Sequence, residues 1–291
     1  MIQYWKQKMY SLHSRHSWLA PLTICILWRI LIEIIGQVSF ALQPEVISPW
    51  AQIPDPPLWA RWDSGWYDSI VRHGYELRGA GVMSNVTFFP LFPLLWKVVE
   101  VVTPLHGFSA GLLVANIFAA ASAVIFYRWV SEQWNTGVAM KTLIAILLFP
   151  TSFFLVSAYS ESTLLFFIVT ALYLSSRRQW SWAALAAALA SAARPTGIFL
   201  WPLLLWLWWS SPRGQRTSAR EILPLAILPP LGLIAFSVYL YFRLGDPFLW
   251  LSGQAAAGRN FVSPLSLLWA HTVNIITRGD HWLKHTAEIA A

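Results

Sequence analysis

Asp63 has the surroundings in this sequence that most favour a chemical role. It lies in the segment LWARWDSGWYDSIVRHGY, residues 58–75, whose spacing predicts one amphipathic helix at a membrane surface. On that helix Asp63 falls between Trp59 and Tyr67 on the aromatic face, where an ionised carboxylate is unfavourable unless a ligand or a reaction requires it. The alternative is helix capping, because small residues follow Asp63. We therefore treat Asp63 as a candidate catalytic carboxylate.

The same segment supplies candidate binding residues. Asp68 and Arg72 are four residues apart on the polar face, opposite the tryptophans, and this spacing predicts a solvated ion pair. His73 is either an ordinary interfacial histidine or, as a neutral imidazole, a group that binds a ligand. The candidate binding residues of this segment are Arg61, Trp62, Trp66, Tyr67, Arg72 and His73.

Three further candidates lie at the ends of apolar runs. Arg194 separates two short apolar segments, where its guanidinium either binds a phosphate or reaches toward the membrane interface. Glu161 opens an apolar run, where a carboxylate either caps the helix N-terminus or contacts a ligand. Asp246 precedes a proline, which favours a turn as much as a contact with a metal or a sugar.

Other patterns limit the chemistry. No group of His, Asp and Glu has metal-ligand spacing and no phosphate-binding glycine loop occurs, so no cofactor is assigned, although assistance by a divalent cation stays open. The single cysteine, Cys25, excludes a disulfide framework and a thiolate zinc site. Arg29 and Glu33 are four residues apart inside an apolar run, which predicts that they neutralise each other.

The elements that must position these residues are membrane helices. The chain is 57% hydrophobic and only 11% charged, which indicates an all-α polytopic membrane protein embedded in a lipid bilayer. Its net charge of +7 is spread through short segments between apolar runs, so we expect no nucleic-acid partner. About seven spans are expected, including an N-terminal run that we interpret as a retained anchor: 17–41, 108–130, 138–157, 160–176, 181–193, 197–210 and 221–242.

Positive charge predicts the topology. If the N-terminus is cytoplasmic, Arg128, Lys141, Arg177 and Arg213 belong on that same side. The external side then receives three segments, which are residues 43–87, the turn at 159–162 and the segment after Arg243. Residues 88–104 carry prolines and charges and are expected to form an interfacial or re-entrant helix, as are the helices of the first external loop.

Five short motifs occur in an order that resembles a known family. They are RWDSGWYDSIVRHGY, TFFPLFPLL, PTSFFLVSAYSES, ARPTG and GDPFLWLSGQ, and the resemblance covers roughly residues 28–270. Each is short and apolar, but their order and spacing resemble the PIG-V family of GPI mannosyltransferase 2 and its prokaryotic relatives, within the GT-C class of membrane glycosyltransferases. The resemblance implies transfer of a mannosyl or related sugar from a polyprenyl-phosphate-linked donor to a lipid or glycan acceptor on the external face.

In that class an acidic residue of the first external loop is catalytic, and the matching residue is Asp63. Relatives continue with further spans, whereas here a membrane domain over 1–270 precedes a polar tail over 271–291, so the chain is expected to be truncated. The membrane is expected to be the plasma membrane in a prokaryote and the endoplasmic reticulum in a eukaryote.

The chemistry needs only one carboxylate. A lipid phosphate is already a good leaving group, so direct inverting displacement requires a base for the acceptor proton and positive charge near the phosphate. Asp63 and Arg194 are the candidates for these two roles. The alternatives are a transporter or lipid flippase, whose polar residues would lie near mid-membrane, and an inactive homologue.

Overall fold

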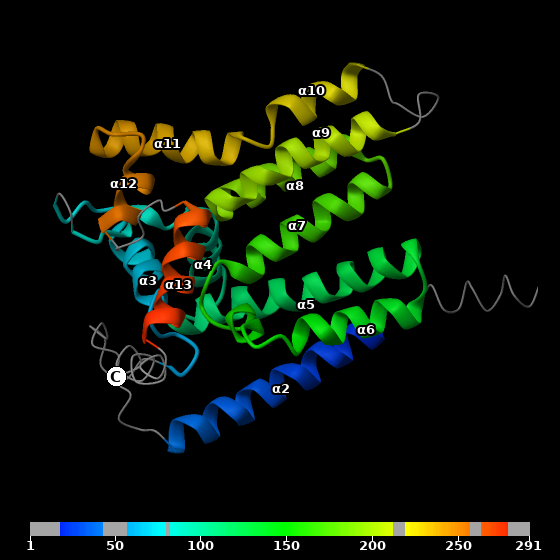
Figure 1. The fold of residues 1–291 in the computed structure, drawn as a ribbon, viewed down its shortest axis with the longest axis horizontal. Helices are drawn as coiled ribbons and strands as arrows, with labels where there is room; N and C mark the ends of the chain where they lie inside the picture. Colours follow the sequence, from blue (N-terminus) through cyan, green and yellow to red (C-terminus); the bar gives the residue numbers. More distant parts are fainter. Residues whose placement is uncertain (1–17, 43–56, 80–81, 212–218, 257–262, 279–291) are drawn as a thin grey trace, which may run out of the picture.

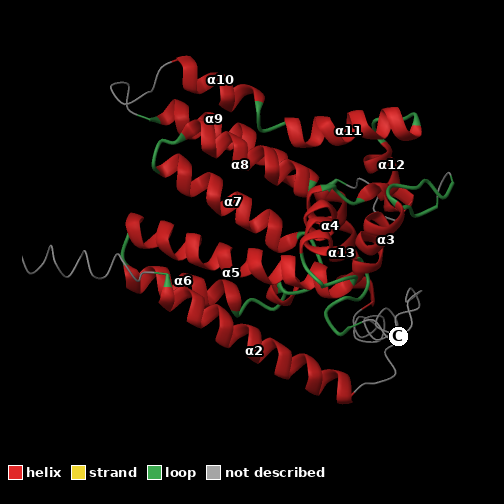
Figure 2. Cartoon of the chain, turned by 180° about the vertical axis from the view of Figure 1, so that it is seen from behind, coloured by secondary structure: helices red, strands yellow, loops and turns green. Residues whose placement is uncertain are grey.

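The chain folds as a bundle of helices, and the prediction of an all-α protein is confirmed. The computed structural model describes residues 18–42, 57–79, 82–211, 219–256 and 263–278, and these contain helices and turns but no strand. The long axes of six helices run side by side through the bundle (Figures 1 and 2). They are α2 (Leu19–Leu42), α5 (Phe108–Gln133), α6 (Thr136–Leu147), α7 (Glu161–Ser176), α8 (Trp180–Ala193) and α9 (Leu200–Ser210).

Shorter elements gather at one end of this bundle, which we call the site end. There α2 and α6 end and α7 begins, as Figure 1 shows. The helices at this end are α3 (Ser64–His73), α4 (Leu91–Val102), α12 (Leu249–Ala256) and α13 (Pro264–Arg278). Three short 3₁₀ turns connect to it: η1 (Asn85–Thr87), η2 (Ser152–Leu155) and η3 (Pro195–Phe199).

Small residues allow close packing around α8, which is rich in fully buried alanines. A Cβ on Gly232 would lie 2.2 Å from the backbone oxygen of Ala188, and one on Gly197 would lie 2.2 Å from the backbone of Ala190. Backbone approaches of this kind are typical of helix interfaces in membranes. They fix the position of the chain just after α8, where Arg194 lies.

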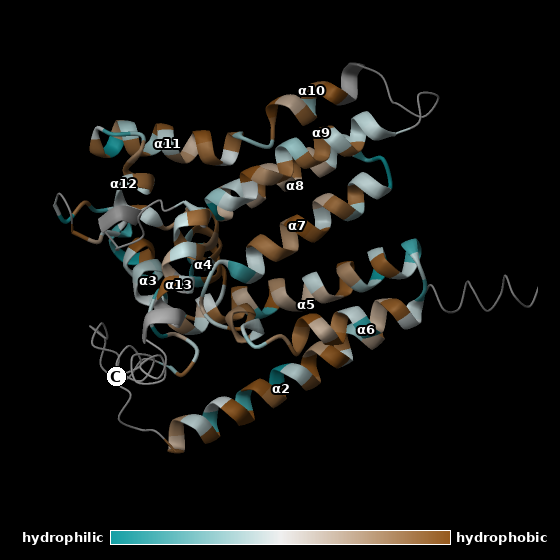
Figure 3. Cartoon of the chain, in the orientation of Figure 1, coloured by the Kyte–Doolittle hydropathy of each residue, from teal (hydrophilic) through white to brown (hydrophobic). Residues whose placement is uncertain are grey.

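The bundle helices contain many apolar residues, drawn in brown in Figure 3. On α2, the large side chains Ile26, Leu27, Ile30 and Ile34 are all about half exposed or more. Contiguous exposed apolar surface of this extent is typical of a face that contacts lipid or a partner. We conclude that the bundle is built for a membrane environment.

Fewer helices than the seven predicted spans are long and apolar enough to cross a bilayer in the described part of the chain. Among the described residues, α2 and α5 are the two helices long and apolar enough to cross a bilayer. The other apolar helices, such as α6 with 12 residues and α8 with 14, would reach only about 18 to 21 Å at 1.5 Å per residue. The expectation of seven full spans is therefore not confirmed.

One predicted span is two helices. The run 221–242 divides into α10 (Ala219–Ile227) and α11 (Leu231–Leu244). The break falls at Pro229 and Pro230, which have no backbone N–H and do not continue a helix hydrogen-bond ladder. Similarly the predicted span 138–157 ends as α6 at Leu147, before Pro150.

The basic residues group only in part as the charge pattern predicts, because Lys141 lies midway along α6. The basic residues Arg128 and Arg177 lie at the end of the bundle opposite α3, which we call the basic end (Figure 1). Residues 88–104 form the short α4, which packs against α3 and α5. Arg213 lies outside the described residues. Which end faces the cytoplasm stays a prediction, as does the division at residue 270, which α13 crosses.

The predicted neutralisation of Arg29 and Glu33 is confirmed. Arg29 Nη1 donates to Glu33 Oε2 at 2.7 Å, and Arg29 Nε donates to Asn116 Oδ1 of α5 at 3.0 Å. The Trp59 indole N–H also donates to Glu33 Oε2, at 2.7 Å. This network attaches the chain that precedes α3 to α2 and α5, and thereby sets the approach to Asp63.

Candidate functional site

Four of the predicted site residues line one cavity at the site end. Asp63, Tyr67, Glu161 and Arg194 border a space of about 260 Å³, which we call the chamber. They come from three places in the sequence: the start of α3, the start of α7 and the end of α8. The other lining residues are Thr87, Phe88, Phe89, Tyr159, Ala193, Pro195 and Thr196.

The predicted helix over 58–75 is wrong in length. The helix α3 begins only at Ser64, because the chain turns at Trp62, which has a φ of +48° in the left-handed region. Trp59 therefore precedes the helix instead of sharing a face with Trp66. The helical phase that placed Asp63 beside Tyr67 does not apply, yet the fold brings both residues to the chamber.

Asp63 occupies the N-cap position of α3, but its side chain makes no capping hydrogen bond. Its backbone N–H donates instead to the hydroxyl of Tyr159, at 3.2 Å. That hydroxyl donates in turn to the backbone oxygen of Arg61, at 3.0 Å. Capping therefore does not account for an acid at this position, and Tyr159 fixes the backbone that carries the carboxylate.

Arg194 and Glu161 form an ion pair across the chamber. Arg194 follows α8 in an extended conformation, and Arg194 Nη1 donates to Glu161 Oε1, 33 residues away in sequence. Burial lowers the pKa of Arg194, but the Glu161 carboxylate raises it, and the net result is a raised pKa. Arg194 is therefore a permanent cation. The second oxygen of Glu161 is buried and has no hydrogen-bond partner among the described residues.

Two tyrosines complete the polar lining. The Tyr67 hydroxyl shares a hydrogen bond of 2.7 Å with Ser160 Oγ, and its ring is held edge-on between Phe88 and Phe92. Burial raises the pKa of Tyr67, and the nearby Glu161 carboxylate raises it further. Burial and the Asp63 carboxylate likewise raise the pKa of Tyr159. Both phenols are therefore protonated at neutral pH.

The structure places four other candidates elsewhere on and around α3. Trp66 stacks on Phe88 with the Arg78 guanidinium over its ring at 4.8 Å. Arg72 Nε donates to Asp68 Oδ2 at 2.7 Å, which confirms the predicted pair. The description of that pair as solvated is wrong, because the Asp68 side chain is only 10% exposed. The remaining two are exposed His73, the last residue of α3, and Trp62, which is 57% exposed.

Asp246 lies away from the chamber, in the turn between α11 and α12. Its Oδ1 accepts a hydrogen bond of 2.7 Å from the backbone N–H of Phe248, two residues on. Asp246 therefore has the turn-forming role that its proline neighbour allowed. Within the described parts of the chain, no group of three or more His, Cys, Asp or Glu side chains is arranged to hold a metal ion.

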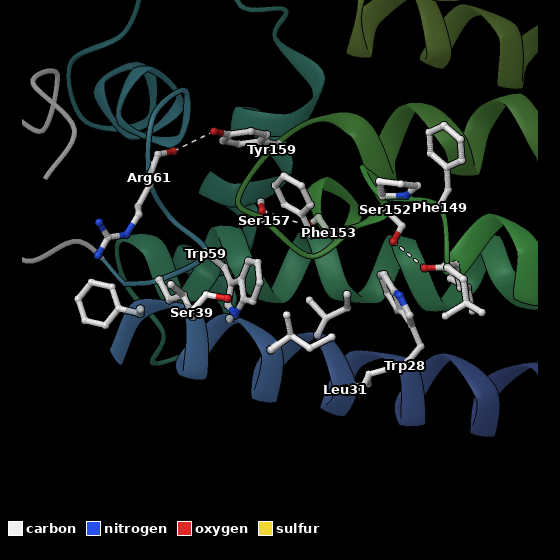
Figure 4. A pocket seen from close by; sticks show the side chains of 18 of the residues that line it. Trp28, Leu31, Ser39, Trp59, Arg61, Phe149, Ser152, Phe153, Ser157 and Tyr159 are labelled. Atoms are coloured by element: carbon white, nitrogen blue, oxygen red, sulfur yellow. Dashed lines mark hydrogen bonds between the residues drawn. The ribbon is translucent and has the colours of Figure 1, made fainter. Parts of the chain in front are cut away.

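Two apolar clefts adjoin the chamber. One lies between α6, η2 and α7, has a volume of about 710 Å³, and ends at Glu161 and Arg194; we call it the α7 cleft. The other runs along α2, has a volume of about 550 Å³, and shares Tyr159 with the chamber; we call it the α2 cleft (Figure 4). Arg61 and Trp62 line the α2 cleft and not the chamber.

Tyr159 is a site residue for which no role was predicted from the sequence. Tyr159 belongs to the motif PTSFFLVSAYSES and lies in the turn expected on the same side as Asp63. Its contact with Asp63 joins positions 96 residues apart, which no local spacing predicts.

Comparison with known proteins agrees with these motifs. A family model described as mannosyltransferase (PIG-V) matches residues 17–205. Two curated relatives, each called GPI mannosyltransferase 2, come from Cryptococcus neoformans var. neoformans serotype D. The protein of strain JEC21 is 29% identical and that of strain B-3501A is 30% identical, each over 201 residues.

Each match covers 62% of this chain and 45% of the relative, so the chain spans about half the length of these curated proteins. No solved structure matches the chain. The family match covers well over half of the chain and includes Asp63, Tyr159, Glu161 and Arg194. The chain therefore belongs to the mannosyltransferase (PIG-V) family.

Proposed function

We propose that this protein transfers a mannosyl or related glycosyl group from a polyprenyl-phosphate-linked donor to a lipid or glycan acceptor at the external face of a membrane. The observation that carries the proposal is the chamber, in which a carboxylate, Asp63, and a permanent cation, Arg194, share one small space. Membership of the mannosyltransferase family supports the choice of sugar.

Asp63 is the proposed general base. In a direct displacement, the acceptor hydroxyl attacks the anomeric carbon while its proton passes to the Asp63 carboxylate and the sugar–phosphate bond breaks. The anomeric configuration inverts, and the freed polyprenyl phosphate needs no proton from a second acid. Two observations support this role. The Tyr159 hydroxyl accepts a hydrogen bond from the Asp63 backbone N–H, and the Asp63 side chain makes no capping hydrogen bond to α3.

Arg194 is the proposed partner of the donor phosphate. Its guanidinium borders both the chamber and the α7 cleft, so a phosphate beside it would leave the prenyl chain in apolar surroundings. Glu161 holds the guanidinium in place through the ion pair. As the bond breaks, negative charge grows on the phosphate, and a fixed cation stabilises it.

The distribution of polar groups supports a transferase over a transporter. Asp63, Glu161 and Arg194 all belong to the site end of the bundle, where α3 and the start of α7 lie (Figure 1). A carrier would require such groups near mid-membrane, along a pathway. A divalent cation has no assigned ligand set among the described residues, and the proposed mechanism uses none.

The test is mannose transfer in proteoliposomes with a mannosyl-phosphoryl-polyprenol donor and a membrane lipid extract as acceptor. Asp63→Asn is expected to lower turnover by about 10² to 10⁴-fold, because the amide keeps the shape but accepts no proton. Asp246→Asn is the matched control, since Asp246 forms a turn away from the chamber. Product with the donor's anomeric configuration, a near-normal rate for Asp63→Asn, or no transfer by the wild-type protein would each contradict the proposal.

A further inference from the structure

The α2 cleft has the form of a site for one lipid chain. Its walls come from α2, from the chain at 58–62 and from η2 with the residues around it. Figure 4 shows Arg61 toward one end of the cleft and Trp28 and Leu31 toward the other. The α2 residues from Trp28 to Phe40 span about 18 Å at 1.5 Å per residue. The cleft is therefore long, narrow and open along an apolar helix.

Charge is confined to one end of this cleft. Arg61 is the one charged residue among those that line it, and its guanidinium lies over the Phe40 ring at 4.9 Å. Arg61 Nε is buried and has no hydrogen-bond partner among the described residues. Arg61 as a whole is only partly buried and lines the cleft, so its guanidinium can donate to an anionic group that enters this end. An apolar cleft with a cation at its end matches an anionic amphiphile.

The cleft wall is rigidly built. The Trp59 ring packs so closely on α2 that a Cβ on Gly36 would lie 2.5 Å from Trp59 Cζ2. The indole N–H is held by Glu33, which is itself paired with Arg29. Glu33 is thereby occupied and does not offset the charge of Arg61. The fold thus maintains a shaped apolar surface beside α2, with an arginine at its end.

If the acceptor is a lipid, the reaction requires a second lipid site. A direct displacement without a covalent intermediate needs donor and acceptor bound together, and a donor held at Arg194 fills the α7 cleft. The α2 cleft meets the same chamber at Tyr159, from the other side of η2. We propose that the α2 cleft binds the hydrocarbon chain of an anionic acceptor lipid whose phosphate contacts Arg61. The assignment of this lipid as the acceptor rests on the proposed function.

Photo-crosslinking tests the site without relying on turnover. Purified protein in phosphatidylcholine vesicles is exposed to a diazirine-tailed phosphatidic acid or to a diacylglycerol with the same tails. Labelled peptides are then identified. We expect the anionic probe to label peptides of α2 and η2 about tenfold more than the neutral probe, the effect of one charge-assisted hydrogen bond. Arg61→Gln should remove that preference, and Arg61→Lys should keep much of it.

A steric variant tests the chain part of the site. Ser39→Trp fills the cleft from an exposed position of α2 and should reduce labelling by both probes. Ile34→Trp, on an exposed position of α2 outside the cleft lining, is the matched control and should leave labelling unchanged. Loss of labelling in both variants would contradict the proposed location.

Three further outcomes separate the explanations. Equal labelling by the two probes would show that bulk bilayer lipid fills the cleft, and would overturn the proposal. Displacement of the phosphatidic acid probe by polyprenyl phosphate would assign the cleft to the donor, and would also overturn it. Selective anionic labelling of a protein that transfers no sugar would confirm the lipid site while rejecting the proposed function.

Discussion

At the scale of single residues, the chamber depends on contacts between positions far apart in the sequence. The Arg194–Glu161 pair joins the ends of two helices, and Tyr159 joins the turn before α7 to the start of α3. Glu161 fixes the Arg194 side chain, and Tyr159 fixes the backbone of Asp63; all four residues line the chamber. Both contacts can be removed by single substitutions, with matched controls at the basic end.

Arg194→Ala should impair use of the lipid donor more than Arg194→Lys does. Lysine keeps the positive charge but loses the planar fork that grips two phosphate oxygens. The measurement is the donor KM and kcat in proteoliposomes, with the amount of folded protein matched. Arg177→Ala is the control, because Arg177 pairs with Glu132 at the basic end with similar exposure. If both Arg194 variants behave like the wild type, Arg194 does not bind the phosphate.

Tyr159→Phe should reduce kcat more than it reduces stability. The ring can keep its stacking on Phe154, but the hydroxyl that accepts from the Asp63 N–H and donates to the Arg61 carbonyl is lost. Each lost hydrogen bond is worth about 1 kcal/mol of stability, whereas a displaced base affects every turnover. Tyr173→Phe, which loses a hydroxyl bonded to Glu132, is the control for stability without catalysis. A Tyr159→Phe enzyme with a normal kcat would remove Tyr159 from the positioning role.

At the scale of elements, helix contacts decide where the ends of α7 and α8 lie. The carbonyl of Ala188 and the Ser191 side chain of α8 approach Gly232 of α11 so closely that the glycine has room for no side chain. The Ser191 hydroxyl also donates to the backbone oxygen of Pro229, in the break between α10 and α11. Packing of α11 against α8 therefore supports the segment that carries Arg194.

Gly232→Ala should destabilise the bundle by about 1 to 3 kcal/mol or more, the usual range for overpacking, since backbone atoms cannot rotate away. Thermal unfolding in detergent measures the change. Gly137→Ala is the control, because its Cβ would approach a side-chain atom, Asn135 Oδ1 at 3.2 Å, and no backbone atom of a neighbouring helix. Equal melting temperatures for the two variants would show that α11 and α8 separate easily.

Helix bounds that depend on neighbouring residues could be predicted from the sequence, whereas bounds that depend on tertiary contacts could not. The bounds of α5 and α7 follow closely from apolar runs, and the Arg29–Glu33 pair follows from four-residue spacing, so all three were predictable from the sequence. The late start of α3 at Ser64 depends on Trp62 adopting a positive φ, while Trp59 is bound to Glu33 across the fold. The hydrophobic periodicity of a segment does not predict such tertiary contacts. The two prolines at 229 and 230, in contrast, are local signals of a break, but the run 221–242 was predicted as one span because its hydropathy stays high across them.

At the scale of the whole molecule, the two ends of the bundle differ in composition. The basic end holds Arg128, Arg177 and Arg178 with the acid Glu132, whereas at the site end residues 57–79 carry three arginines against three acids and Arg194 pairs with Glu161. Lys and Arg in short loops favour the cytoplasmic side of a membrane. The site end should therefore face the exterior, together with the openings that donor and acceptor lipids would use.

Cysteine labelling tests this orientation. Ser64 is fully buried and unsuitable as a probe, so Glu76, exposed after α3, and Gln179, exposed between α7 and α8, are the positions to use. In a Cys25→Ser background, Glu76→Cys should react with an impermeant maleimide in intact cells, because residues 43–87 carry no excess of positive charge. Gln179→Cys, beside Arg177 and Arg178, should react only after the membrane is permeabilised. The reverse pattern would place the chamber on the cytoplasmic face, and a donor presented from outside would then be unable to reach Arg194.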